Sequence, residues 1–184
     1  MKLNYEDEHN HRLSRAWQAL RDGKIQMAIV SSFENCETDR LKPLDIHMVR
    51  ELWSKTYNAH GKPDWSHLYP YYHPDIVFQD SVQRIEGMAE FIGLCERLTR
   101  RCESIQMDIL SIAQDSNIIL MDWIMTMSFK KYPPTPVYGS TKLTLHADGR
   151  IIAQRDYYDL WGDIFNGIPY FKKAYRKFMH KNFG

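Results

Sequence analysis

Two aspartates stand in segments that are otherwise rich in apolar and aromatic residues, where a carboxyl group can act on protons. Asp156 lies in the segment 151–161, and Asp80 ends the segment 75–80. Burial raises the pKa of a carboxyl group, and two carboxylates that face one cavity repel each other and raise one pKa further. We therefore predict that Asp80 and Asp156 are the catalytic acid and base of a proton-transfer reaction.

Each aspartate also has a structural interpretation that the sequence leaves open. Asp80 could cap the turn between its strand and the following helix, or meet solvent at the rim of a cavity. Asp156 could form an ion pair with Arg84, or with Arg155 of a neighbouring chain. His73 could be a catalytic or ligand group, although a lone histidine is more often hydrogen-bonded at a rim or in a core.

Aromatic and sulfur-containing side chains would form the wall of such a cavity. Residues 118–129 carry apolar side chains at every odd position, which indicates a half-buried strand. Tyrosine hydroxyls can donate hydrogen bonds to a substrate oxygen, although buried tyrosines also serve as ordinary core residues. An apolar wall with few polar groups favours a hydrophobic, ring-containing substrate. The residues that we predict to bind substrate are Tyr57, Tyr72, Phe78, Trp123, Met125, Thr141 and Tyr158.

Periodicity and turn signals predict the elements that position these residues. Helical spacing predicts helices near 43–60, 64–69 and 87–98. Strands are predicted over 75–80, 104–113, 118–129, 137–146 and 151–161. Asp148-Gly149 is a hairpin signal, and the proline-rich segment 130–136 is predicted to be a loop. Helices followed by a run of long strands indicate an α+β fold, in which a strongly curved sheet wraps on helices and leaves an open end for a ligand.

Both ends of the chain extend beyond this domain. We expect a helical extension over 1–43, the main domain over 44–162, and a basic amphipathic helix within 163–184. The last segment places five lysines and arginines opposite an apolar stripe of Phe171, Ala174, Tyr175 and Phe178. Such a helix could lie on a membrane. We expect it instead to pack its stripe on its own domain or across a dimer, where it would form a lid over the cavity.

Composition excludes several classes of function. The formal net charge is +1, which gives no overall field for nucleic acid. Three cysteines without a CxxC motif signal neither a disulfide framework nor a metal cluster. Neither a phosphate loop nor a dinucleotide fingerprint is present, so we expect no cofactor and no metal. Without a long apolar run we expect no membrane span and a soluble, cytoplasmic protein.

Three stretches carry a resemblance to a known superfamily. They are WSKTYNAHGKPDWSHLYPYYHPDIVFQDS, RIEGMAEFI and GSTKLTLHADGRIIAQRDYYDLWG, which fall within residues 44–162. In order and spacing they resemble the nuclear transport factor 2-like superfamily, and within it the SnoaL-like branch. The resemblance implies a cone-shaped α+β barrel of the cystatin-like type and a homodimer formed through the outer faces of the sheets. This superfamily includes ketosteroid isomerase, scytalone dehydratase, limonene epoxide hydrolase, polyketide cyclases and noncatalytic binding proteins.

The resemblance to ketosteroid isomerase carries over in part. Asp80 falls where that enzyme has its general base. Its oxyanion-hole tyrosine falls nearest Thr56, one residue before Tyr57, and its second oxyanion donor falls near Thr141. In this alignment the chain therefore lacks the oxyanion-hole tyrosine that the ketosteroid isomerase mechanism uses as its electrophile.

The resemblance to limonene epoxide hydrolase and to polyketide cyclases extends to one catalytic position, Asp156. Asp156 falls on one catalytic aspartate of limonene epoxide hydrolase, and its other two catalytic residues fall on Trp123 and Met125, so that triad is broken. Polyketide cyclases also use an aspartate near Asp156. We expect a cofactor-independent isomerase, cyclase or dehydratase that acts on a hydrophobic small molecule. The alternatives are a noncatalytic binder of such a ligand and a dimeric protein-interaction module.

Overall fold

The computed structural model describes residues 42–57, 60–129, 132–164 and 170–183. The chain divides into two units, Met1–Leu41 and Lys42–Gly184, and the second unit contains all the described residues. The helix predicted in the N-terminal extension lies outside the described residues. No helix in the described part of the chain is long and apolar enough to cross a membrane. The cytoplasmic location stays a prediction.

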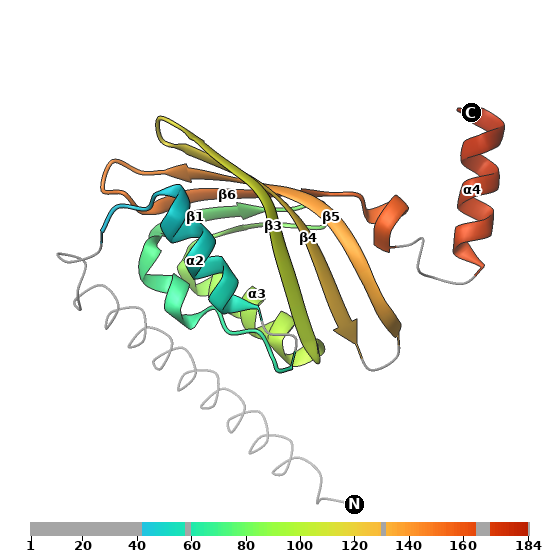
Figure 1. The fold of residues 1–184 in the computed structure, drawn as a ribbon, viewed down its shortest axis with the longest axis horizontal. Helices are drawn as coiled ribbons and strands as arrows, with labels where there is room; N and C mark the ends of the chain where they lie inside the picture. The colour runs from blue at the N-terminus through green and yellow to red at the C-terminus, as the bar shows by residue number, and fades with distance from the viewer. Residues whose placement is uncertain (1–41, 58–59, 130–131, 165–169, 184) are drawn as a thin grey trace, which may run out of the picture. The chain divides into compact units, whose positions relative to one another are not determined.

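Six strands form one curved, mixed sheet in the order β2-β1-β6-β5-β4-β3 (Figure 1). The pair β1 and β6 is parallel and the other neighbours are antiparallel. The sheet is open, so the predicted α+β class is confirmed with a curved sheet and not a closed barrel. The strands are β1 (Tyr72–Gln79), β2 (Arg84–Glu86), β3 (Ser104–Asp115), β4 (Ile118–Phe129), β5 (Tyr132–Leu145) and β6 (Ile151–Tyr158).

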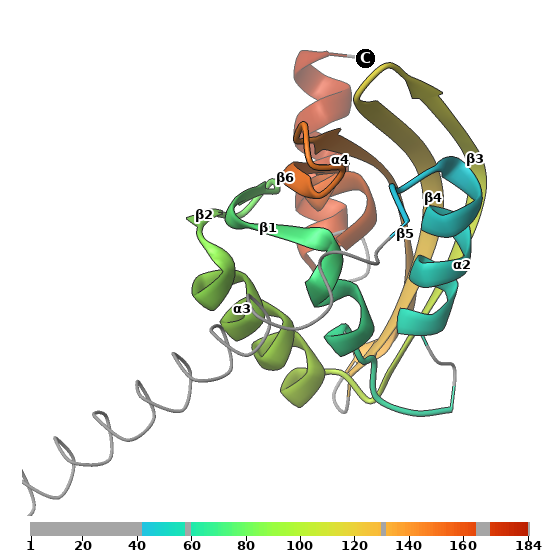
Figure 2. The same cartoon turned by 90° about the vertical axis from the view of Figure 1, so that its left-hand side faces the viewer.

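Three helices lie on the concave side of the sheet (Figure 2). They are α2 (Ile46–Thr56), the 3-10 helix η2 (Ser66–Tyr71) and α3 (Met88–Arg101). The side chain of Asp45 accepts hydrogen bonds from the backbone N–H groups of His47 and Met48, at 2.9 and 2.8 Å. This cap starts α2 at Ile46, so the predicted start at Pro43 is wrong.

The predicted loop over 130–136 is also wrong, because β5 begins at Tyr132 and pairs with β4 from its first residues. Proline is usually confined to sheet edges because it has no N–H to donate. β6 pairs with β5 only from Gly139 onwards. The earlier part of β5 therefore has a partner on one side only, and Pro136, opposite Thr126, is tolerated there.

A bulge at the start of β6 decides which of its side chains face inwards. Leu145 pairs with Ile151 and Thr144 pairs with Ala153, so Ile152 is an extra residue. Side-chain alternation along the segment 151–161 predicts that Ile152, Gln154, Asp156, Tyr158 and Leu160 share the inward face. Ile151 is fully buried instead, so the prediction for Ile152 is wrong. Beyond the bulge the inner face carries Gln154, Asp156 and Tyr158, as predicted, and the strand ends at Tyr158. Leu160, predicted on that face, instead begins the short π-helix η3 (Leu160–Ile164).

The C-terminal helix α4 (Phe171–Asn182) packs less than its apolar stripe predicts. Trp161 stacks on Phe171 and Tyr175, with ring centroids 5.6 and 5.7 Å apart. No side chain of α4 is buried, and Phe178 is 57% exposed. None of its residues lines the cavity between the sheet and the helices, so α4 does not form the predicted lid over the cavity of its own chain.

Gly139 of β5 leaves room for the indole ring of Trp123 on the neighbouring strand. The two residues are paired across β4 and β5. A Cβ atom at Gly139 would overlap the Trp123 ring and lie 2.7 Å from the backbone oxygen of Tyr157. Glycine inside a strand often marks such a close approach.

We expect Gly139→Ala to lower the free energy of unfolding by about 2 kcal/mol, because overpacking displaces a buried ring. Urea unfolding measures this. Gly93→Ala is the matched control, since its Cβ would lie 3.4 Å from the flexible end of Arg97. Alanine in place of glycine within a helix should stabilise the protein by about 0.5–1 kcal/mol. Equal effects of the two substitutions would contradict this role of Gly139.

Candidate functional site

A cavity of about 470 Å³ lies between the inner face of the sheet and the helices α2 and α3. Its volume is in the range of small-molecule sites. The wall consists mainly of aromatic and apolar side chains, among them Trp53, Trp65, Phe91 and Leu98. All nine residues predicted to act on or bind a substrate line this one cavity: Asp80, Asp156, Tyr57, Tyr72, Phe78, Trp123, Met125, Thr141 and Tyr158.

The parallel pairing of β1 and β6 brings the two aspartates together. The register joins Phe78 to Gln154 and Gln79 to Arg155, so Asp80, directly after the end of β1, follows beside Asp156 of β6. Side chains alternate across a strand, which turns Phe78 and Asp80 towards the same cavity. Residues that are far apart in sequence thus meet because of one parallel strand pair.

Two chains of hydrogen bonds converge on Asp156. In one, the Tyr72 hydroxyl donates to Gln154 Oε1 at 2.6 Å, and Gln154 Nε2 donates to both carboxylate oxygens at 3.1 and 3.2 Å. In the other, Trp123 Nε1 donates to Thr141 Oγ1 at 2.9 Å, and Thr141 Oγ1 donates to Asp156 Oδ1 at 2.8 Å.

The outer members of these chains fix the direction of the inner bonds. An indole N–H can only donate, so the Thr141 oxygen accepts from Trp123 and its own proton is directed to Asp156. Because Gln154 Oε1 accepts from Tyr72, its NH₂ group is turned to the carboxylate. The site is therefore organised to supply donors to Asp156.

Burial raises the pKa of Asp156 to about 6. The hydrogen bonds from Thr141 and Gln154 act in the opposite direction, and the nearby charge of Asp80 adds to the rise. A pKa in this range allows one group both to take up and to release a proton near neutral pH. This is the property that general acid–base chemistry requires.

Asp80 has a different environment. Its Oδ1 accepts hydrogen bonds from the backbone N–H groups of Val82 and Gln83 at 2.8 and 2.7 Å. This oxygen therefore caps the turn after β1, as the structural interpretation of Asp80 expects. Its Oδ2 accepts from the Tyr158 hydroxyl at 3.1 Å. Burial and the charge of Asp80 raise the pKa of Tyr158 well above its usual value. Tyr158 is thus a neutral phenol that Asp80 orients.

The ion pair considered for Asp156 does not form within the described chain. Arg84 pairs instead with Glu86 at 2.8 Å. The guanidinium carbon of Arg155 lies 5.2 Å from the centre of the Tyr157 ring.

Several cavity residues were not predicted. Gln154 was predicted to share the inward face of its strand with Asp156, but not to contact a ligand or Asp156 itself. Helix α3 adds Leu94, Cys95, Arg97 and Arg101. The sequence places an apolar stripe that includes Cys95 and Leu98 on this helix, but a stripe does not tell whether it faces a filled core or a cavity. Burial raises the pKa of the Cys95 thiol to about 12, so this cysteine is a poor nucleophile.

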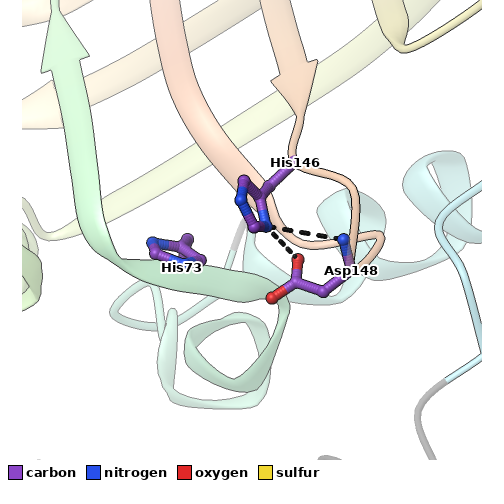
Figure 3. Close-up of side chains that lie close together, drawn as sticks. All are labelled: His73, His146 and Asp148. Atoms are coloured by element: carbon purple, nitrogen blue, oxygen red, sulfur yellow. Dashed lines mark hydrogen bonds and ion pairs between the residues drawn. The ribbon is translucent and has the colours of Figure 1, made fainter.

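His73 lies outside the cavity, in a second group of titratable side chains (Figure 3). His73, His146 and Asp148 each place a possible metal-ligand atom within 4.8 Å of the others. Partial burial raises the pKa of Asp148, but hydrogen bonds from Arg150 and His146 outweigh it and hold the pKa well below its usual range. Arg150 donates to Asp148 from its backbone nitrogen at 3.0 Å and from Nε at 2.8 Å. These hydrogen bonds give Asp148 a structural role in the hairpin turn between β5 and β6.

The chain belongs to the SnoaL-like domain family, which matches residues 49–154, more than half of the sequence. The resemblance to the SnoaL-like branch of the nuclear transport factor 2-like superfamily is thereby confirmed. Its members include cofactor-free isomerases, cyclases and epoxide hydrolases. No curated protein matches the sequence at a significant level.

Solved structures share this fold at low sequence identity. An LEH-like epoxide hydrolase from M. tuberculosis is 20% identical, covers 69% of this chain and 93% of its own, and has a TM-score of 0.53. A putative SnoaL-like polyketide cyclase from Jannaschia sp. CCS1 is 19% identical, with 66% and 91% covered and a TM-score of 0.52. A Catenulispora acidiphila protein with a ketosteroid isomerase-like fold is 16% identical, with 65% and 90% covered and a TM-score of 0.55. These likenesses show the fold alone, because one fold supports many functions.

The raised pKa of Asp156 predicts how stability depends on pH. Protonated Asp156 favours the folded state, so its contribution is full below about pH 4 and is lost as the pH rises through about 6. Asp156→Asn cannot titrate. Between pH 4.5 and 7.5 the wild type should therefore lose about 2 kcal/mol of unfolding free energy relative to the variant. Urea unfolding at both pH values measures this, and a difference that is independent of pH would contradict it.

Proposed function

We propose that this protein is a cofactor-independent acid–base enzyme of the isomerase, cyclase or dehydratase type, acting on a hydrophobic substrate in the cavity. The observation that carries the proposal is the Asp156 carboxyl group, which is buried in an aromatic cavity and held by two oriented donors. A carboxyl group with a pKa of about 6 is suited to remove a proton from a carbon acid at neutral pH.

In the proposed reaction Asp156 takes a proton from a carbon atom next to a substrate carbonyl group. The electron pair of the broken C–H bond moves to the carbonyl oxygen, and an enolate forms. Protonated Asp156 then returns the proton to another carbon in an isomerisation, or to a departing hydroxyl group in a dehydration. Asp80 and Tyr158 form the second polar group of the cavity, and their proposed role is to orient a substrate oxygen.

The wall supports a hydrophobic substrate. Phe78 and Trp123 are almost fully buried, and Met125 adds a flexible apolar surface. Aromatic and thioether groups accommodate a ring by dispersion contacts and need no exact polar match. The proposed ligand groups Tyr57 and Tyr72 are buried phenols whose pKa is raised well above its usual value, first by burial. Both therefore stay neutral at physiological pH.

We expect the protein to exchange the acidic C–H protons of hydrophobic cyclic ketones with D₂O, as followed by NMR over a panel of such ketones. The rate should rise as the pH passes about 6, because Asp156 acts in its ionised form. Asp156→Asn should lower the exchange rate at least about 100-fold, since a general base contributes about 10²–10⁴. Asp80→Asn should have a smaller effect on the rate.

Asp122→Asn is the matched control for this experiment. Asp122 is hydrogen-bonded to Ser111 and Ser140 on the outer face of the sheet, away from the cavity. Its replacement should leave the exchange rate unchanged. Ketone binding with no Asp156-dependent exchange would instead support the noncatalytic binder.

The proposed homodimer would use the outer face of the sheet. Four large apolar side chains on that face are between 50% and 59% exposed: Leu110, Leu120, Tyr138 and Tyr157. Several exposed large apolar side chains on one face of a sheet are typical of protein interfaces.

If the outer face forms the dimer, Tyr138→Arg should convert a dimer into a monomer, because it buries an unpaired charge at the interface. Sedimentation velocity measures the change. Tyr138→Phe keeps the apolar ring and should remain dimeric. A wild-type protein that sediments as a monomer at micromolar concentration would exclude the dimer.

A further inference from the structure

Two arginines stand at the open side of the cavity. Arg97 and Arg101 both line it, and both are solvent-exposed, whereas the carboxyl group of Asp156 lies inside. They are four residues apart on α3, so their side chains emerge one helical turn apart on the same face. The described part of the cavity therefore has a mainly apolar wall, the hydrogen-bonded carboxyl group of Asp156 inside, and two arginines at its exposed edge.

The described residues provide no charged partner for either arginine. Neither forms an ion pair with any residue that the structure describes, whereas their neighbour Arg100 pairs with Glu96 at 3.8 Å. A positive side chain can also stabilise the end of a helix. Lys62 already does this for α3, since its Nζ donates to the backbone oxygens of Thr99, Arg100 and Cys102.

The arrangement of the two charges is unfavourable without a ligand. Like charges four residues apart on a helix repel each other. Among the described residues, neither carboxylate of the cavity forms an ion pair with these arginines: Asp80 accepts hydrogen bonds from Val82, Gln83 and Tyr158, and Asp156 accepts them from Thr141 and Gln154. An anionic group placed at the mouth would remove the repulsion and gain charge-assisted hydrogen bonds.

We propose that Arg97 and Arg101 form an anion-binding subsite, and that the substrate is an amphiphile with an apolar body and one anionic group, such as a carboxylate, sulfate or phosphate. The apolar body occupies the aromatic cavity beside Asp156, and the anionic group lies at the two guanidinium groups. This proposal rests on the proposed function of the same cavity and adds the chemical class of its substrate.

Two fluorescent probes with the same rings test the subsite. 1-Anilinonaphthalene-8-sulfonate carries a sulfonate group, and N-phenyl-1-naphthylamine lacks it. Arg97→Gln/Arg101→Gln should weaken binding of the sulfonate probe about fivefold, since each exposed ion pair contributes little. Binding of the neutral probe should change less than twofold. The difference should shrink at 1 M salt, which screens exposed charges.

Two control variants locate the anion. Arg100→Gln removes an arginine of the same helix that does not line the cavity, and it should leave both probes unaffected. Lys173→Gln/Lys177→Gln tests the basic helix α4, which also carries aromatic side chains. Loss of sulfonate binding in either control equal to that in Arg97→Gln/Arg101→Gln would overturn the subsite. So would a sulfonate affinity that is insensitive to both cavity arginines.

A cavity-filling variant separates failure of this inference from failure of the proposed function. Met125→Trp places a large ring in the cavity wall and should weaken both probes. If the neutral probe binds and Met125→Trp blocks it, a sulfonate probe that ignores Arg97 and Arg101 overturns the subsite alone. If neither probe responds to Met125→Trp, the cavity takes no apolar ligand, and both proposals fail.

Discussion

Removal of the Asp156 carboxyl group from bulk water is the constraint on which the rest of the site depends. A buried carboxyl group needs hydrogen-bond partners, because leaving it without them is strongly unfavourable. Thr141 and Gln154 supply these partners, and Trp123 and Tyr72 orient them. The donors compensate only part of the lost hydration, so the pKa stays raised, at about 6. The burial of Asp156 therefore both requires the ordered hydrogen bonds around it and raises its pKa into the range useful for proton transfer.

Irregular features of the sheet bring these groups within reach of one another. The extra residue Ile152 shifts the register of β6, so that Gln154 and Asp156 face inwards while Ile151 is buried. Gly139 leaves space for Trp123, which can then donate to Thr141. The single parallel strand pair, β1 with β6, places the aspartates of two distant segments beside each other. Each feature is local, and together they shape one cavity.

Much of the fold follows from sequence patterns, whereas the cavity network follows only in part. Alternation over β4 and the turn at Asp148 predict the strands and the hairpin, and the three matching stretches predict the family. The prolines in the segment 130–136 wrongly predict a loop through to Pro136. Whether a strand tolerates them depends on where β6 stops pairing with β5, which the local sequence does not show. The role of Gln154 depends on its contact with Tyr72, 82 positions away along the chain. Strand parity gives the direction of a side chain but not its partner across the sheet.

The most direct test of the buried carboxyl group is a carboxyl ¹³C NMR titration of the protein labelled at aspartate, with Asp156→Asn used to assign the Asp156 signal. A midpoint near pH 6 is predicted for Asp156, because burial outweighs the bonds from Thr141 and Gln154. A midpoint near the usual aspartate value, about 4, would mean that the carboxyl group is hydrated. That result would contradict the buried, oriented carboxyl group on which the proposed chemistry is based.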